Sequence, residues 1–167
     1  GGIHRARIAK LEILNIQHCF EWAIQQPHAD LSALLSLAAA ALLRNSGPFE
    51  GVTAMLRRAK KSITEDTPLL ARVLCEQGRI ATHRESGDIA EQLLNEAISL
   101  ADSLDIASVA TQARVHLAYV LARTNRLDLA IPMARAAVEI ANQADEQQDR
   151  PTALYCRGHL TYKSGEP

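Results

Sequence analysis

The stretch of sequence that decides the fold is VHLAYVL at residues 115–121, because three other stretches share its pattern. They are LAAAALL at 37–43, CEQGRIA at 75–81 and YCRGHLT at 155–161. Each has a small residue at its centre, and these residues follow one another at steps of 38, 40 and 40 positions: Ala40, Gly78, Ala118 and Gly158. Self-similarity at such a period is typical of helical repeat arrays, in which each repeat is one supersecondary unit.

Turn residues follow each of the four stretches, at 45–48, 85–88, 124–126 and 164–167. A second amphipathic run follows each of the first three turns, with its own small residue: Ala59, Ala97 and Ala137. Two helices that cross closely need small residues where their backbones approach. A glycine inside a helix costs about 1 kcal/mol relative to alanine. We therefore expect Gly78 and Gly158 each to lie close to a neighbouring helix.

The apolar residues follow helical spacing, and no alternating run between turns predicts a strand. The predicted fold class is all-α: a right-handed α-α superhelix of about three and a half helix-turn-helix repeats plus an N-terminal helix. The predicted helices span 4–25, 30–44, 48–62, 67–84, 88–103, 105–123, 127–144 and 150–163. They form one domain over 1–167, divided into the N-terminal helix at 4–25, repeats at 30–62, 67–103 and 105–144, and the first half of a fourth repeat at 150–167.

Composition narrows the classes of function. The formal net charge is -1 and no basic run stands out, so we expect no nucleic-acid binding through this segment. No apolar run is long enough to span a membrane. The three cysteines have no metal-ligand spacing, which is typical of reduced thiols in a cytoplasmic protein. No catalytic triad, nucleophile elbow or histidine-based metal motif is present, so we expect neither an enzyme nor a cofactor.

Residues 117–137 resemble the tetratricopeptide repeat consensus: Leu117-Ala118, Leu121, Asn125, Leu127, Ala130 and Ala137. The longer period resembles repeats in regulators similar to the maltose-operon activator. Residues 11–24 resemble the segment that opens the C-terminal repeat region of bacterial signal-transducing NTPase regulators. The resemblance implies a sensor or interaction segment of a larger bacterial transcriptional regulator, which binds a protein, a peptide or a small inducer.

The resemblance also implies a binding surface, since the first helix of each tetratricopeptide repeat lines the concave face. Counting from the central small residues gives a basic, tyrosine-bearing groove suited to an acidic peptide or a chain carboxylate. Its candidate residues are Arg44, Arg72, Arg79, His83, Gln112, Tyr119, Arg123, Tyr155, His159 and Tyr162. The alternative is that the arginines are solvated or pair locally with Glu76 and Glu85.

The sequence ends in the turn of the fourth repeat, so we expect the last helix to lack its partner and the natural protein to continue. An uncapped end of this kind predicts a homodimer through the C-terminal helix. The second function class is therefore a structural self-association scaffold. Near the other end, we expect Trp22 to pack in the core or to cap the end of the helix stack.

Overall fold

The computed structural model describes residues 2–26, 29–44, 49–84, 87–144 and 147–165. Within these ranges the chain is all-α, with no strand, and none of the helices is long and apolar enough to cross a membrane. The predicted helices are present within two residues of their expected ends. They are α1 (Gly2–Ala23), α2 (Ala29–Leu42), α3 (Glu50–Ser62), α4 (Pro68–Arg84), α5 (Gly87–Ser103), α6 (Ala107–Arg123), α7 (Leu127–Gln143) and α8 (Arg150–Ser164).

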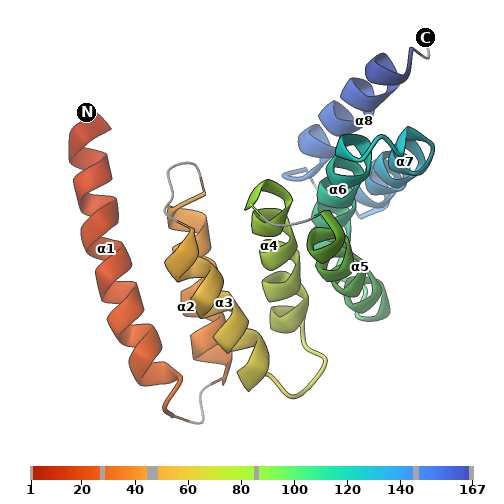
Figure 1. The fold of residues 1–167 in the computed structure, drawn as a ribbon. Coiled ribbons are helices and arrows are strands. Elements are labelled where there is room, and N and C mark those ends of the chain that lie inside the picture. The colour runs from red at the N-terminus through yellow and green to blue at the C-terminus, as the bar shows by residue number, and fades with distance from the viewer. Residues whose placement is uncertain (1, 27–28, 45–48, 85–86, 145–146, 166–167) are drawn as a thin grey trace.

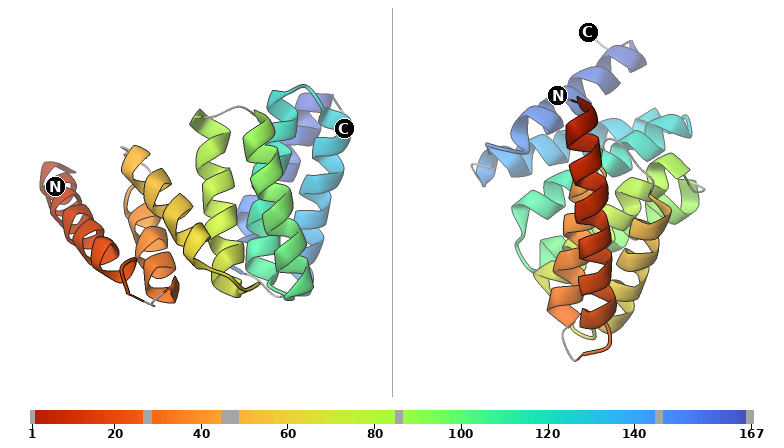
Figure 2. Two further views of the ribbon diagram at one scale, coloured as in Figure 1. Left: turned by 60° about the horizontal axis from the view of Figure 1, so that its bottom comes forward. Right: turned by 90° about the vertical axis from the view of Figure 1, so that its left-hand side faces the viewer.

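The helices follow one another in a row, with the two chain termini at opposite ends (Figures 1 and 2). Each helix packs against the next one in sequence. In addition α2 contacts α4, α4 contacts α6, and α6 contacts α8. We call α2, α4, α6 and α8 the even layer, and α3, α5 and α7 the odd layer. The contacts along the even layer decide which of its side chains remain exposed.

Helix α4 belongs to both hydrophobic clusters of the core. Val73 and Ile80 pack with α1, α2 and α3, whereas Leu74 and Ala81 pack with α5, α6 and their neighbours. Every residue from Val73 to Thr82 is buried as a result. Because one helix serves both clusters, apolar burial continues from α1–α3 through α4 to α5–α8.

The close contact expected at Gly78 is confirmed, and the one expected at Gly158 is wrong. A Cβ atom at Gly78 would lie 2.6 Å from Cγ of Leu94, a fully buried side chain of α5. At Gly158 a Cβ atom would meet nothing within 4 Å. The reason is positional: α5 packs on α4 and α7 packs on α6, but no described helix packs on the corresponding face of α8.

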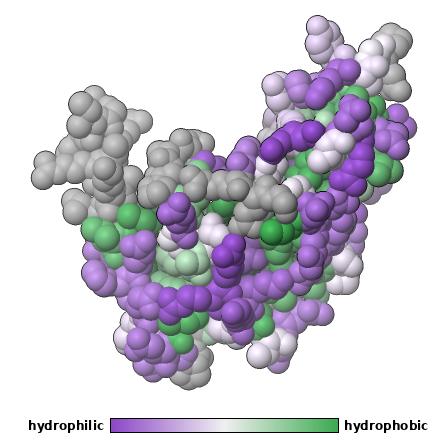
Figure 3. All heavy atoms as spheres, viewed as in Figure 1, coloured by the Kyte–Doolittle hydropathy of each residue, from purple (hydrophilic) through white to green (hydrophobic). Residues whose placement is uncertain are grey.

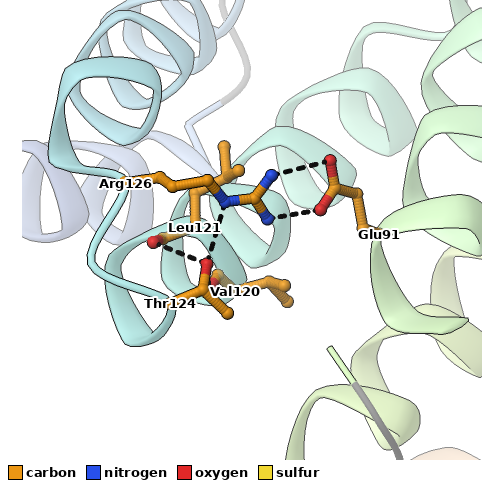
Figure 4. A network of polar contacts seen from close by, with 5 residues as sticks. All are labelled: Glu91, Val120, Leu121, Thr124 and Arg126. Carbon is orange, nitrogen blue, oxygen red and sulfur yellow. Dashed lines mark hydrogen bonds and ion pairs between the residues drawn. The ribbon is translucent and has the colours of Figure 1, made fainter. Parts of the chain in front are cut away.

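Polar contacts fix the turn between α6 and α7 against α5 (Figure 4). The Arg126 guanidinium donates to both carboxylate oxygens of Glu91, at 2.5 and 3.3 Å, and its Nε donates to the Thr124 hydroxyl at 3.0 Å. That hydroxyl donates in turn to the Leu121 carbonyl oxygen at 3.0 Å. The turn before α7 is therefore held on α5 by polar as well as apolar contacts.

The core position expected for Trp22 is wrong, since its side chain is 56% exposed. Phe20 and Ala23 are fully buried on the face of α1 that contacts α2. At about 100° per residue, position 22 points away from that face. Trp22 therefore lies on the open side of α1.

Candidate functional site

Nine of the ten residues predicted to line one groove are distributed over three separate places, and the tenth, Arg79, is buried. The residues are separated because successive even-layer helices pack against one another and thereby cover much of the predicted groove face. Thr82 of α4 and Val115 and Ala122 of α6 are buried. Arg79 is only 8% exposed, so it does not present a free guanidinium as predicted.

The first place is a cleft of about 410 Å³ between α2, α4, α6 and the residues just before α8, which we call the even-layer cleft. It contains three of the predicted residues, Arg44, Arg72 and Gln112. Its remaining wall is partly apolar and partly polar, with Leu37, Cys75, Glu76, Ser108, Val109, Gln148 and Asp149.

Most charged groups of the even-layer cleft are already paired. Glu76 accepts from Nε of Arg79 at 2.5 Å and from Nη2 of Arg44 at 3.4 Å. Arg79 therefore forms the local ion pair with Glu76 that the sequence suggested as an alternative to groove binding. Asp149 accepts a hydrogen bond from the Gln112 amide at 3.0 Å.

Arg72 differs from the other charged groups of the cleft. It is exposed, and within the described residues it forms no hydrogen bond or ion pair. The cleft is lined by two arginines and two carboxylates, so its formal charges balance. Its binding capacity for a carboxylate therefore centres on Arg72.

The second place is aromatic and lies where α6 meets α8. The rings of Tyr155 and His159 stack with centroids 6.2 Å apart, and Tyr155 is 69% exposed. Tyr162, which is 85% exposed, lies on the same helix. Tyr119 is half-buried beside the Cys156 thiol, and burial raises the pKa of its hydroxyl to about 12. Tyr119 is thus a packing residue, and the open aromatic surface that the described residues offer at this place comes from the α8 side chains.

The third place is the end of α4, where His83 is exposed and Arg123 donates to the main-chain carbonyl oxygen of Thr82. Carbonyl groups in the last turn of a helix have no partner within that helix. Arg123 supplies one from α6, so its role here is structural.

The imidazole of His116 and the thiol of Cys75, both in the even layer, are uncharged at physiological pH. Burial, followed by the charges of Arg79, Arg44 and His83, lowers the pKa of His116 to about 3. Burial also raises the pKa of the Cys75 thiol to about 12. The cleft therefore offers hydrogen bonds, apolar contact and one free guanidinium among the described residues, but no thiolate nucleophile.

Sequence reasoning missed two features. The carboxylates of the cleft were not recognised as part of the site, because Asp149 lies before α8 and outside the counted helix positions. The second missed feature is Gln77, which stands directly before the central Gly78. The corresponding positions carry the buried residues Ala39 and Leu117 in the first and third repeats and the exposed Arg157 in the last helix. Gln77 is therefore the polar residue that stands at a covered position.

When the chain is compared with known proteins, no protein-family model, curated protein or solved structure matches it.

Proposed function

We propose that this chain is a protein-interaction segment that binds a partner polypeptide in the even-layer cleft. The observation that carries the proposal is Arg72, an exposed guanidinium without a partner in the described residues, beside the apolar atoms of Leu37 and Val109. Guanidinium groups bind carboxylates through two parallel hydrogen bonds. Clefts of a few hundred Å³ with apolar walls and a few polar groups suit one or two side chains. The preferred ligand is a peptide that pairs a carboxylate with a neighbouring aliphatic side chain.

We further propose that the segment belongs to a larger bacterial transcriptional regulator in the cytoplasm and acts as its sensor. Support comes from the tetratricopeptide resemblance at 117–137 and from the resemblance of 11–24 to the NTPase regulators. The helix contacts agree with the repeat part of this proposal. Each first helix packs on its own second helix and on the first helix of the next repeat. Occupancy of the cleft by a peptide, or by a small inducer with the same carboxylate, would bias the even-layer packing.

A displayed library of random peptides tests the proposed function. Peptides selected on the wild-type protein should be rich in Asp, Glu and aliphatic residues. Arg72→Glu should weaken their binding by about tenfold or more, because it replaces a bidentate contact by repulsion. Arg135→Glu, an exposed cation of α7 outside the cleft, should leave binding unchanged. Equal affinities of the wild type and Arg72→Glu, measured by fluorescence anisotropy, would refute the proposal.

A specific observation also favours the second candidate function, a self-association scaffold. Leu154 is 40% exposed on α8, and Gly158 leaves open space beside it. We propose that a second copy covers this face. Sedimentation velocity should then show a concentration-dependent dimer that Leu154→Glu abolishes. A wild-type protein that sediments as a monomer at every concentration excludes this function and leaves the cleft proposal unaffected.

A further inference from the structure

A second groove, of about 500 Å³, lies on the odd layer between α3 and α5, with α4 beneath it. We call it the odd-layer groove. Figure 3, drawn in the view of Figure 1, shows hydrophilic and hydrophobic residues side by side over these helices. None of the ten predicted site residues lines it.

An unsatisfied amide of Gln77 lines this groove. The side chain is 6% exposed, and its Nε2 atom is buried with no hydrogen-bond partner in the described residues. In the first and third repeats this position belongs to the core, since Ala39 and Leu117 occupy it and are buried. In α8, whose corresponding face no described helix covers, the exposed Arg157 occupies it. Buried polar groups in native proteins nearly always have a partner, so an exception at a core position requires a reason. An acceptor oxygen from a ligand in the groove supplies one.

The groove also offers apolar surface to a ligand. Ile89 on α5 is 44% exposed, and Leu93, one helical turn further, is half-buried beside it. Both line the groove next to Gln77. An aliphatic side chain placed here would remove this surface from water while its main chain remained near the amide of Gln77.

The charges around the groove are mostly positive. Arg57, Lys60 and Lys61 line it together with a single carboxylate, Glu96. Glu96 is paired with Lys60 at 2.8 Å, which leaves Lys61 without a carboxylate partner among the described residues. Charge complementarity therefore favours an acidic ligand. The apolar part of the groove distinguishes an acidic peptide from a nucleic acid, whose phosphates would leave Ile89 and Leu93 uncovered.

We infer that the odd-layer groove is a second docking site, for an acidic peptide segment. The peptide places an aliphatic side chain on Ile89 and Leu93, a carbonyl oxygen on the amide of Gln77, and carboxylates near Lys61. The site lies on the opposite layer from the even-layer cleft and shares no lining residue with it. The two sites are therefore separable by mutation.

The experiment uses the Arg72→Glu protein, in which the even-layer cleft is disabled, so that its outcome is independent of the proposed function. Random displayed peptides are selected on this protein, and their dissociation constants are measured by fluorescence anisotropy. We expect peptides that combine Asp or Glu with Leu, Ile or Val. Adding Lys61→Glu should weaken them by about tenfold, while adding Arg135→Glu should change nothing.

Gln77→Leu provides a second test, because leucine already occupies the equivalent position in the third repeat as Leu117. The variant should fold, as judged by circular dichroism, and should also weaken the selected peptides by about tenfold. Three outcomes would each overturn the inference: no enrichment of peptides, enrichment of basic or purely apolar peptides, or acidic peptides whose affinity Lys61→Glu leaves unchanged. Binding of a labelled single-stranded oligonucleotide in place of peptides would also overturn it.

Discussion

Alanine substitutions at Gly78 and Gly158 should shift stability in different directions, although both glycines occupy the central position of a first helix. In an open helix, replacing glycine by alanine stabilises the protein by about 1 kcal/mol, since glycine has the lower helix propensity. Gly158 meets this condition because a Cβ atom there has no neighbour within 4 Å. Gly158→Ala should therefore raise the free energy of unfolding by about 1 kcal/mol.

At Gly78 the same gain is opposed by a steric clash. The new Cβ would lie 2.6 Å from Cγ and 2.7 Å from Cδ2 of Leu94, and 3.4 Å from its main-chain nitrogen. Cγ is the branch point of a fully buried side chain, so it cannot move aside without displacing α5. Overpacking of this kind costs about 1–3 kcal/mol. After the propensity gain is subtracted, Gly78→Ala should lie between neutral and about 2 kcal/mol destabilising.

The difference between the two variants isolates the packing contribution, because the propensity gain is common to both. That difference should be about 1–3 kcal/mol in urea unfolding followed by far-ultraviolet circular dichroism. A double-mutant cycle gives the control. In a Leu94→Ala background the clash is removed, so Gly78→Ala should become stabilising, as at Gly158. Equal effects of the two single substitutions, or a destabilising Gly78→Ala that Leu94→Ala fails to reverse, would refute the close approach of α4 and α5.

Three further predictions concern groups of the even layer. His116 has a folded-state pKa of about 3, below its ordinary value of 6.5, so the unfolded chain binds more protons between these values. The contribution of His116 to the free energy of unfolding should therefore be fully present above pH 6.5 and should fall by up to about 1.4 kcal/mol per pH unit below it. In urea unfolding at a series of pH values, His116→Asn should flatten this slope. Ellman's reagent should modify Cys19 in the native protein, but Cys75 and Cys156 only in denaturant. The reason is that burial raises the pKa values of the Cys75 and Cys156 thiols to about 12 and about 11. Rapid labelling of all three cysteines in the native protein would contradict this prediction. Glu76→Ala leaves the buried Arg79 without its partner and should cost about 3 kcal/mol or more in urea unfolding, whereas Glu96→Ala, which breaks a more exposed pair, should cost less than about 1 kcal/mol.

The helices were predictable because their signals are local. The central small residues, the turn residues between runs and the period near forty place all eight within two residues of their observed ends. The contact of Gly78 with Leu94 also follows from local chemistry, since a glycine inside a helix indicates a close neighbour. The same rule fails at Gly158, because whether another helix covers α8 is not encoded in α8 itself.

The binding surface was only partly predictable, since it depends on how tightly the even-layer helices pack. Of the ten residues obtained by counting positions, Arg44, Arg72 and Gln112 line one cleft in the structure. Counting positions cannot reveal that Arg79 is buried against Glu76, because that depends on the contacts of α4 with α2 and α6. Gln77 is the opposite case: its polar side chain at a core register position was visible in the aligned repeats, although its unsatisfied amide required the structure.

Photo-crosslinking from two equally exposed leucines tests most directly whether the even-layer cleft is the binding surface. Leu34 lies on α2, one turn before the cleft residue Leu37, and is 50% exposed; Leu129 lies on α7 and is 49% exposed. With benzoylphenylalanine at either position, a peptide selected on the wild-type protein should crosslink from position 34 and not from position 129. Crosslinking from position 129 alone, or equally from both, would contradict binding in the cleft.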